Sequence, residues 1–132
     1  MNLLLDTHVL VWWLNDEPRL SRAQLQALDR ASAAGERLGV SAISFWEIAK
    51  LIEHGRLKLP RSLDQFFDEI ESHPAVQLLP LSPRISIEST RLGARFHHDP
   101  ADQIIAATAR VHGLRLITAD ERIRDSGVVA IV

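Results

Sequence analysis

Short, continuously apolar segments alternate with capped helical segments along this chain, and this alternation restricts the fold more than any other feature. The predicted strands are residues 2–6, 38–41, 76–79 and 114–118, with a possible fifth strand at 128–132 on the edge of the sheet. Strands without polar alternation are typical of a parallel sheet covered on both faces. The sequence therefore predicts an α/β/α sandwich with right-handed crossovers and a mostly parallel central sheet of four to five strands.

Capping signals set the boundaries of the predicted helices. Ser21 and Ser62 each begin a capping box that ends on a Gln three residues later. Proline stands at the first helical position after Ser82 and after Asp99. The predicted helices cover about residues 8–14, 22–35, 44–54, 63–73, 83–96 and 100–113.

Composition indicates an ordinary globular protein. The chain has 132 residues, 46% of them hydrophobic and 24% charged, and no linker or repeat, so we expect one domain over residues 1–132. The apolar run at residues 9–14 is too short to cross a membrane and lacks the flanks of a signal peptide. There is no cysteine, which excludes disulfides and thiolate zinc sites. We expect a cytoplasmic protein without a membrane partner.

Four acidic residues stand where an α/β sheet gathers its loops: Asp6, Glu47, Asp102 and Asp120. Each follows a predicted strand or lies in the first turn of a helix, and these places converge at the carboxyl edge of a parallel sheet. Two like charges about 4 Å apart repel by roughly 4 kcal/mol at an effective dielectric constant near 20. A cluster of four carboxylates therefore predicts a bound cation, and oxygen ligands favour Mg²⁺ or Mn²⁺.

The charge of the rest of the chain permits a polyanionic substrate. The net charge is −2, and Arg supplies 13 of the 15 basic residues. If the four acids share one pocket, the remaining surface is net basic. Arginine is also the better residue for bidentate contacts with phosphate.

All four of these acids have alternative structural explanations, and for Asp102 the alternative is an acid favoured at the helix start by the helix dipole. Asp6 and Asp120, taken singly, are consistent with turn or N-cap residues. Glu47 completes a capping-box pattern that starts at Ser44, and Lys50 stands where it can form an ion pair with Glu47. Only the presence of the other acids favours a functional interpretation of Glu47.

Asp102 is more informative because it lies on the apolar face of its helix. That face also carries Ile105, Ala106 and Ala109, so the carboxylate is expected to point inward and to need a partner or a metal. Asp99 is better explained as the N-cap of this helix, with a supporting role at the site as the alternative.

The other residues that could suggest chemistry are less persuasive. Adjacent histidines in a loop point apart, so His97 and His98 are not expected to form a metal site. Trp12, Trp13 and Trp46 are expected in the core or in a dimer interface, and not as platforms for base stacking.

Four segments, in this order and spacing, closely resemble the PIN-domain family and, within it, the VapC-type toxins of bacterial toxin–antitoxin modules. They are residues 3–14, 40–49, 99–109 and 116–120, and the resemblance extends from Leu3 to Val132. It implies a PIN-like sandwich and a ribonuclease that hydrolyses RNA phosphodiester bonds. It also implies a homodimer, held inactive by a cognate antitoxin whose tail crosses the active-site groove. Apolar residues expected to help line that groove are Val9, Trp12, Trp13 and residues 45–52.

The resemblance places the family's acidic quartet, which binds Mg²⁺ or Mn²⁺, on the four acids named above. Thr7 matches the residue after the first acid, and Thr118 matches a hydroxyl residue that steadies a metal-bound water. Asp6 and Asp102 are the expected principal ligands; Glu47 and Asp120 are expected to bind through water or to orient the nucleophile. One metal or two are both compatible with these ligands. Gln103 departs from the pattern, since similar sequences often carry Arg there, and this puts one substrate contact in doubt.

Three other functions remain open from the sequence. The first is a PIN ribonuclease with a housekeeping role in RNA processing. The second is an aspartate-based phosphoryl-transfer enzyme, which is disfavoured because such enzymes typically have a second acid where this chain has His8. The third is a non-catalytic binding module on the same fold, which an intact set of four acids argues against.

Overall fold

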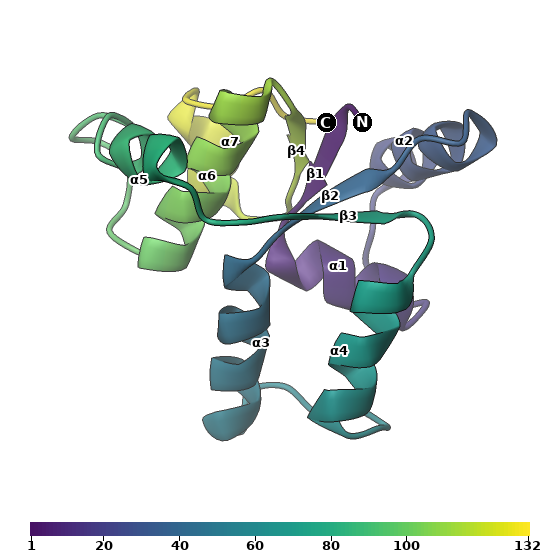
Figure 1. The fold of residues 1–132 in the computed structure, drawn as a ribbon. Helices are drawn as coiled ribbons and strands as arrows, with labels where there is room; N and C mark the ends of the chain where they lie inside the picture. The colour runs from purple at the N-terminus through teal and green to yellow at the C-terminus, as the bar shows by residue number, and fades with distance from the viewer.

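The computed structural model describes all residues 1–132, and four parallel strands form its centre. These strands are β1 (Leu3–Leu5), β2 (Leu38–Ser41), β3 (Val76–Leu79) and β4 (Arg115–Ile117), arranged in the order β3-β2-β1-β4 (Figure 1). The helices are α1 (Thr7–Leu14), α2 (Arg22–Ala33), α3 (Ile43–Glu53), α4 (Leu63–Ser72), α5 (Pro83–Ser89), α6 (Pro100–His112) and α7 (Glu121–Ser126). The expected α/β architecture with a mostly parallel sheet is confirmed, and all four of its strands are parallel.

Two apolar layers cover the two faces of the sheet. In β1, Leu3 and Leu5 pack into one cluster with residues of α1, α2 and α4, while Leu4 packs into a second cluster with residues of α6 and α7. All three leucines are buried, which explains why this strand has no polar alternation. The order of layers is therefore helix, sheet, helix, as the sequence predicted.

The strand order places a topological switch point between β1 and β4. From β1 the chain moves outward through β2 to β3, and it then returns to the other side of β1 as β4. Leu5 is paired with Ile117, so the residues that follow these two strands emerge side by side. Crevices at such points, outside the carboxyl ends of the strands, are the usual ligand sites of open α/β sheets.

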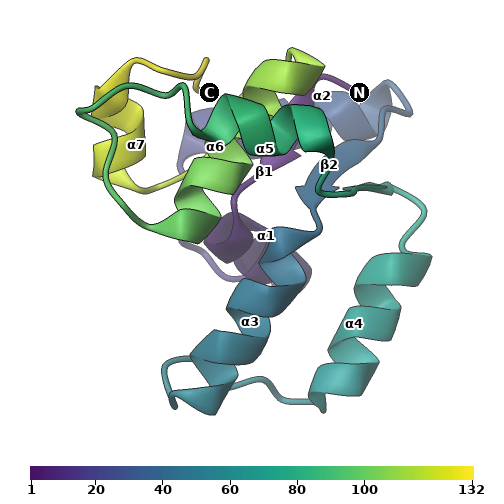
Figure 2. The same ribbon diagram turned by 60° about the vertical axis from the view of Figure 1, so that its left-hand side comes forward.

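Helices α3 and α4 extend away from the sheet as a pair (Figures 1 and 2). Phe45 on α3 meets Phe67 on α4 edge to face, with ring centroids 4.9 Å apart. Trp46 is 50% exposed, so it is not a core residue, and its alternative place in a dimer interface stays a prediction. Trp12 and Trp13 are partly buried against the core. Val9 is fully buried, and it is therefore a core residue that does not line a surface groove.

Three parts of the chain differ from the predicted elements. The helix that begins at Pro83 ends at Ser89 and not near Phe96, because Gly93 has a φ of 99°, which a right-handed helix cannot contain. The segment 128–132 contributes one isolated parallel bridge, from Ile131 to Leu116, and no fifth strand. Helix α7 was not predicted, since its six residues are too few to show a helical period. No helix is long and apolar enough to span a membrane.

Candidate active site

Asp6 is the central carboxylate of the site, and the chain holds both of its oxygens. It follows β1 directly, caps α1 and is only 2% exposed. Its Oδ1 accepts a hydrogen bond from the Thr7 backbone N–H at 2.8 Å, and its Oδ2 accepts one from the Thr118 hydroxyl at 2.6 Å. The second contact crosses from β1 to the end of β4, so Asp6 is fixed by the strand pairing at the switch point.

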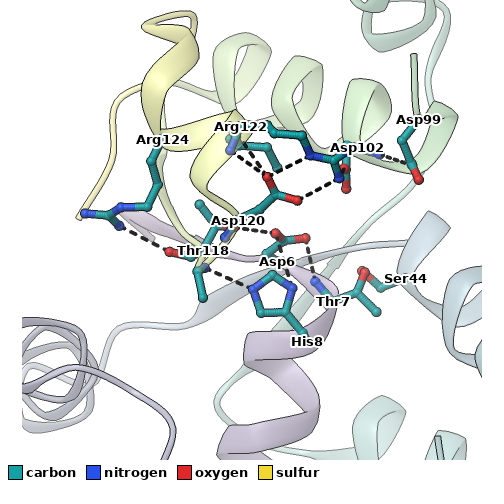
Figure 3. A network of polar contacts seen from close by, with 12 residues as sticks. Asp6, Thr7, His8, Ser44, Asp99, Asp102, Thr118, Asp120, Arg122 and Arg124 are labelled. Carbon is teal, nitrogen blue, oxygen red and sulfur yellow. Dashed lines mark hydrogen bonds and ion pairs between the residues drawn. The ribbon is translucent and has the colours of Figure 1, made fainter. Parts of the chain in front are cut away.

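The two threonines belong to the same buried network. The Thr118 hydroxyl accepts the Asp120 backbone N–H at 3.0 Å while it donates to Asp6 (Figure 3). The Thr7 hydroxyl lies 2.9 Å from the Ser44 hydroxyl, which ties α1 to α3. Both predicted supporting residues therefore lie beside the acids and hold neighbouring elements in place.

Asp102 and Asp120 approach each other from the first turn of α6 and the start of α7. Asp99 is the N-cap of α6 as predicted, and its Oδ1 accepts the Asp102 N–H at 3.0 Å. Asp120 is the N-cap of α7. The Arg122 guanidinium lies between the two acids, 3.0 Å from Asp120 Oδ2 and 3.8 Å from Asp102 Oδ2 (Figure 3).

Glu47 projects from α3 toward the same place, and one of its oxygens, Oε1, is buried without a hydrogen-bond partner. The predicted capping box is wrong, because α3 begins at Ile43 and Ser44 lies inside the helix. The predicted ion pair with Lys50 is also wrong, since Lys50 instead bonds to Glu53 at 3.0 Å. Neither structural explanation for Glu47 survives, and a buried oxygen without a partner calls for a ligand.

Burial and mutual repulsion raise the pKa of two of the acids. Burial raises the pKa of Glu47 to about 7. The nearby Thr7 hydroxyl opposes this increase, and the charges of Asp6 and Asp102 add to it. Burial likewise raises the pKa of Asp102 to about 6, partly offset by its hydrogen bond to His97. These are the shifts expected of carboxylates gathered without a counter-ion.

Asp120 behaves differently because it has a cationic partner. Its burial raises the pKa, but hydrogen bonds and the charge of Arg122 outweigh burial and bring the pKa below the ordinary value. The same contact raises the pKa of the Arg122 guanidinium. Arg122 therefore supplies part of the positive charge that the carboxylate cluster requires.

Two sets of ligand atoms are close enough to hold a metal ion, and they share Asp102. In each set the atoms lie within 4.8 Å of one another; the sets are His97, Asp102 and Asp120, and Glu47, Asp99 and Asp102. Asp6 is outside both sets, although its charge raises the pKa of Glu47 and of Asp102. The oxygen-rich donors, the free Glu47 oxygen and the raised pKa values together fit a divalent cation.

Three residues at the site were not anticipated. His97 Nε2 lies 2.6 Å from Asp102 Oδ2, so this histidine lies at the site, whereas the prediction that His97 and His98 form no metal site stays untested. His8 accepts the Ala119 N–H at 3.0 Å, and its Nδ1 lies 3.5 Å from Asp6 Oδ2. Arg122 is the third. Each is close in sequence to one of the acids, which is the only signal that could have identified them.

Gln103 also has a defined place. Its side-chain amide donates to the His97 carbonyl at 3.2 Å. This contact joins α6 to the loop that precedes it and holds the backbone of His97. Gln103 thus supports the loop beside Asp102.

Comparison with known proteins agrees with this geometry. The PIN-domain family model matches residues 3–128, and the chain is 38% identical over 122 residues to Ribonuclease VapC22 of Mycobacterium tuberculosis, covering 92% of this chain and 89% of that protein. The chain belongs to the PIN-domain family.

Two solved structures share the fold. One is VapBC2 from Rickettsia felis bound to a DNA fragment from its promoter, with a TM-score of 0.70, 17% identity, and coverage of 100% of this chain and 98% of that chain. The other is DNA-bound VapBC from Salmonella typhimurium, with a TM-score of 0.70, 18% identity, and coverage of 100% and 97%. At these identities, the likeness concerns the fold.

Proposed function

We propose that this PIN-domain protein is a metal-dependent endoribonuclease that hydrolyses RNA phosphodiester bonds and acts as the toxin of a toxin–antitoxin module. The observation that carries the proposal is the buried, unpartnered Glu47 oxygen beside Asp6 and Asp102, at the switch point of the sheet. A relative of 38% identity that is named a ribonuclease supports the choice of RNA as substrate.

In this proposal Asp6, Glu47, Asp102 and Asp120 are the catalytic residues, and their oxygens hold Mg²⁺ or Mn²⁺. When bound, such an ion supplies a Lewis acid for the phosphodiester and lowers the pKa of water. Thr7, Thr118 and Asp99 fix the acids through the hydrogen bonds described above. They keep the carboxylates in place before the substrate arrives.

Glu47 is the group best suited to move a proton. Its Oε1 makes no hydrogen bond within the protein, so this oxygen is free to accept a proton from a water molecule. Glu47 therefore orients the attacking water and takes its proton as the new bond to phosphorus forms. The ester oxygen then departs from phosphorus on the opposite side.

We also propose a cognate antitoxin and a homodimer in the cytoplasm, with residues 1–132 acting as one unit. The support comes from solved VapBC complexes with the same fold. The exposed Trp46 on α3 is available to a protein partner. The alternative is a housekeeping PIN ribonuclease with the same chemistry and no antitoxin.

The first experiment is RNA cleavage by the purified protein with Mg²⁺ or Mn²⁺, beside an EDTA control. Asp6→Asn is expected to reduce the cleavage rate by about 10³-fold or more, because it removes a charge worth several kcal/mol to the transition state. Asp29→Asn makes the same chemical change at an exposed position on α2 and serves as the matched control. Equal rates for both variants, or no cleavage and no metal binding by calorimetry, would sink the proposal in favour of a binding module.

Expression in cells separates the toxin from the housekeeping enzyme. Induction of the unmodified chain is expected to arrest growth, and induction of Asp6→Asn is not. Co-expression of the antitoxin encoded beside it should restore growth. A chain that cleaves RNA in vitro but leaves growth unaffected would support the housekeeping alternative.

A further inference from the structure

We propose that a polar hollow beside the carboxylates binds a backbone phosphate of the RNA, next to the phosphodiester that is cleaved. The hollow has a volume of about 330 Å³ and is lined by Arg95, His97, Arg122, Asp125 and Ser126. None of the lining side chains is apolar, so the hollow suits a charged ligand and not a nucleobase. The inference rests on the proposed ribonuclease function and specifies where its substrate lies.

Two of the lining residues also contact the carboxylates. His97 bonds to Asp102, and Arg122 reaches both Asp102 and Asp120. A ligand in the hollow is therefore separated from the site of cleavage by single side chains. One nucleoside separates successive phosphates of a single strand. A phosphate bound in the hollow is therefore a near neighbour of the phosphate whose ester bond is cleaved.

The arginines of this hollow are available for a phosphate. Arg95 is exposed and takes part in none of the chain's ion pairs. Arg122 is paired, but its side chain is 63% exposed and its partners are oxygens that a divalent cation also requires. A cation held by Asp102 and Asp120 would compete for the same oxygens and would leave the guanidinium free to face the hollow. Both groups can then bind phosphate in the bidentate geometry of arginine.

Asp125 is the one acidic side chain in the lining. With two arginines and one aspartate the hollow keeps a net positive charge once Arg122 is released. Asp125 reduces the attraction for a phosphate without cancelling it. Its removal should therefore strengthen RNA binding, a change opposite in sign to the effect of removing Arg95.

A second hollow also carries two arginines, Arg19 and Arg124, but neither of them contacts Asp102 or Asp120. Arg124 donates to the carbonyls of Thr118 and Val132, each at 3.2 Å. Arg19 pairs with Glu17 at 3.4 Å. Figure 3 shows Arg122 and Arg124 leaving the helix in different directions, with only Arg122 facing the acids. The hollow beside Arg95 is therefore the better phosphate site.

The test is the salt dependence of RNA binding, measured by fluorescence anisotropy with a labelled single-stranded RNA of mixed sequence. The protein carries Asp6→Asn so that the probe stays intact, and Mn²⁺ is present. Arg95→Gln is expected to reduce the slope of log K against log salt by about 0.7 and to weaken binding about fivefold at about 0.1 M salt. Asp125→Asn is expected to tighten binding.

Arg84→Gln is the matched control, since Arg84 is exposed and lies near Arg110 and Val111 at the far end of α6 from Asp102. Melting curves confirm that each variant is folded. The subsite is overturned if Arg95→Gln behaves as Arg84→Gln does, or if the parent binds no RNA. The unmodified chain could cleave no RNA while Arg95→Gln still weakens RNA binding and reduces the salt slope. That result would contradict the proposed ribonuclease function and would still support a phosphate-binding hollow.

Discussion

Asp6 and Glu47 are acids of one site that the protein holds in opposite ways. Asp6, at the end of β1, has a hydrogen-bond donor on each oxygen, one from Thr7 and one from Thr118. Glu47, on α3, leaves Oε1 buried and without a donor, and its pKa is raised to about 7. The strand side of the site, which is Asp6 with its two threonine donors, therefore has all of its hydrogen bonds within the protein. The helix side, which is Glu47 on α3, does not.

The difference follows from the elements that carry the two residues. The register of β1 and β4 places Asp6 beside Thr118, so the pairing of the strands itself provides the donor. Helix α3 reaches the site only through side chains, and its Ser44 hydroxyl is bonded to Thr7. An uncompensated carboxylate is costly to folding, and a bound cation would offset that cost.

Breaking the strand side should have the largest effect on stability. Thr118→Val removes the donor to Asp6 Oδ2 and the acceptor for the Asp120 N–H. The first of these hydrogen bonds is buried and the second is partly buried. The expected decrease in the free energy of unfolding is about 2–3 kcal/mol, because two polar groups lose their partner. Urea unfolding of the metal-free protein provides the measurement.

Thr108→Val is the matched control for this change. Thr108 is equally buried, but its hydroxyl only donates to the Ile104 carbonyl within α6, so its loss should cost less than about 1 kcal/mol. Thr118→Ser keeps the hydroxyl and should recover most of the stability. Equal losses for the two valine variants would mean that Asp6 does not depend on Thr118.

The two sides of the site also differ in how far the sequence could predict them. Asp6 and Asp102 were recognised because a strand end and an inward helix face are periodic features, visible in the chain itself. The pattern at Ser44 and Glu47 is identical to a capping box, and only the three-dimensional start of α3 at Ile43 rules that out. His97 reaches Asp102 through a loop whose path depends on Gly93 and on packing of Phe96, and no local pattern encodes such a path.

The pH dependence of stability sharpens the comparison. The folded-state pKa of Glu47 is about 7 against an ordinary value of 4.5, and that of Asp102 is about 6 against 3.8. The folded protein thus holds these protons more tightly than the unfolded chain does. The free energy of unfolding of the metal-free protein should therefore fall as the pH rises from about 4.5 to about 7, and saturating Mg²⁺ should reduce that fall.

Glu47→Gln tests the assignment of this effect. The variant cannot ionise, so its metal-free stability at about pH 7.5 should exceed that of the unmodified chain by on the order of 1 kcal/mol, a figure discounted for partial exposure. Thermal melts over the pH range measure it. Glu53→Gln, the same change on the exposed face of α3, should leave the slope unaltered, since the pKa of Glu53 is lowered by its bond to Lys50. An unchanged slope in Glu47→Gln would assign the effect to Asp102 alone.

The smallest predicted effect concerns Arg122, the positively charged side chain that lies between Asp102 and Asp120. Arg122 pairs with Asp120 at 3.0 Å and approaches Asp102 at 3.8 Å, so it opposes a divalent ion that needs the same oxygens. Exposed ion pairs are worth about 0.2–1 kcal/mol, so Arg122→Gln should tighten Mn²⁺ binding about twofold to fivefold in calorimetry, while Arg84→Gln should not. Because Arg122 also faces the phosphate hollow, the same variant should bind RNA more weakly. An arginine with a purely structural role would not give tighter Mn²⁺ binding together with weaker RNA binding when it is replaced. Weaker Mn²⁺ binding by Arg122→Gln would show instead that Arg122 holds the two carboxylates in their binding geometry.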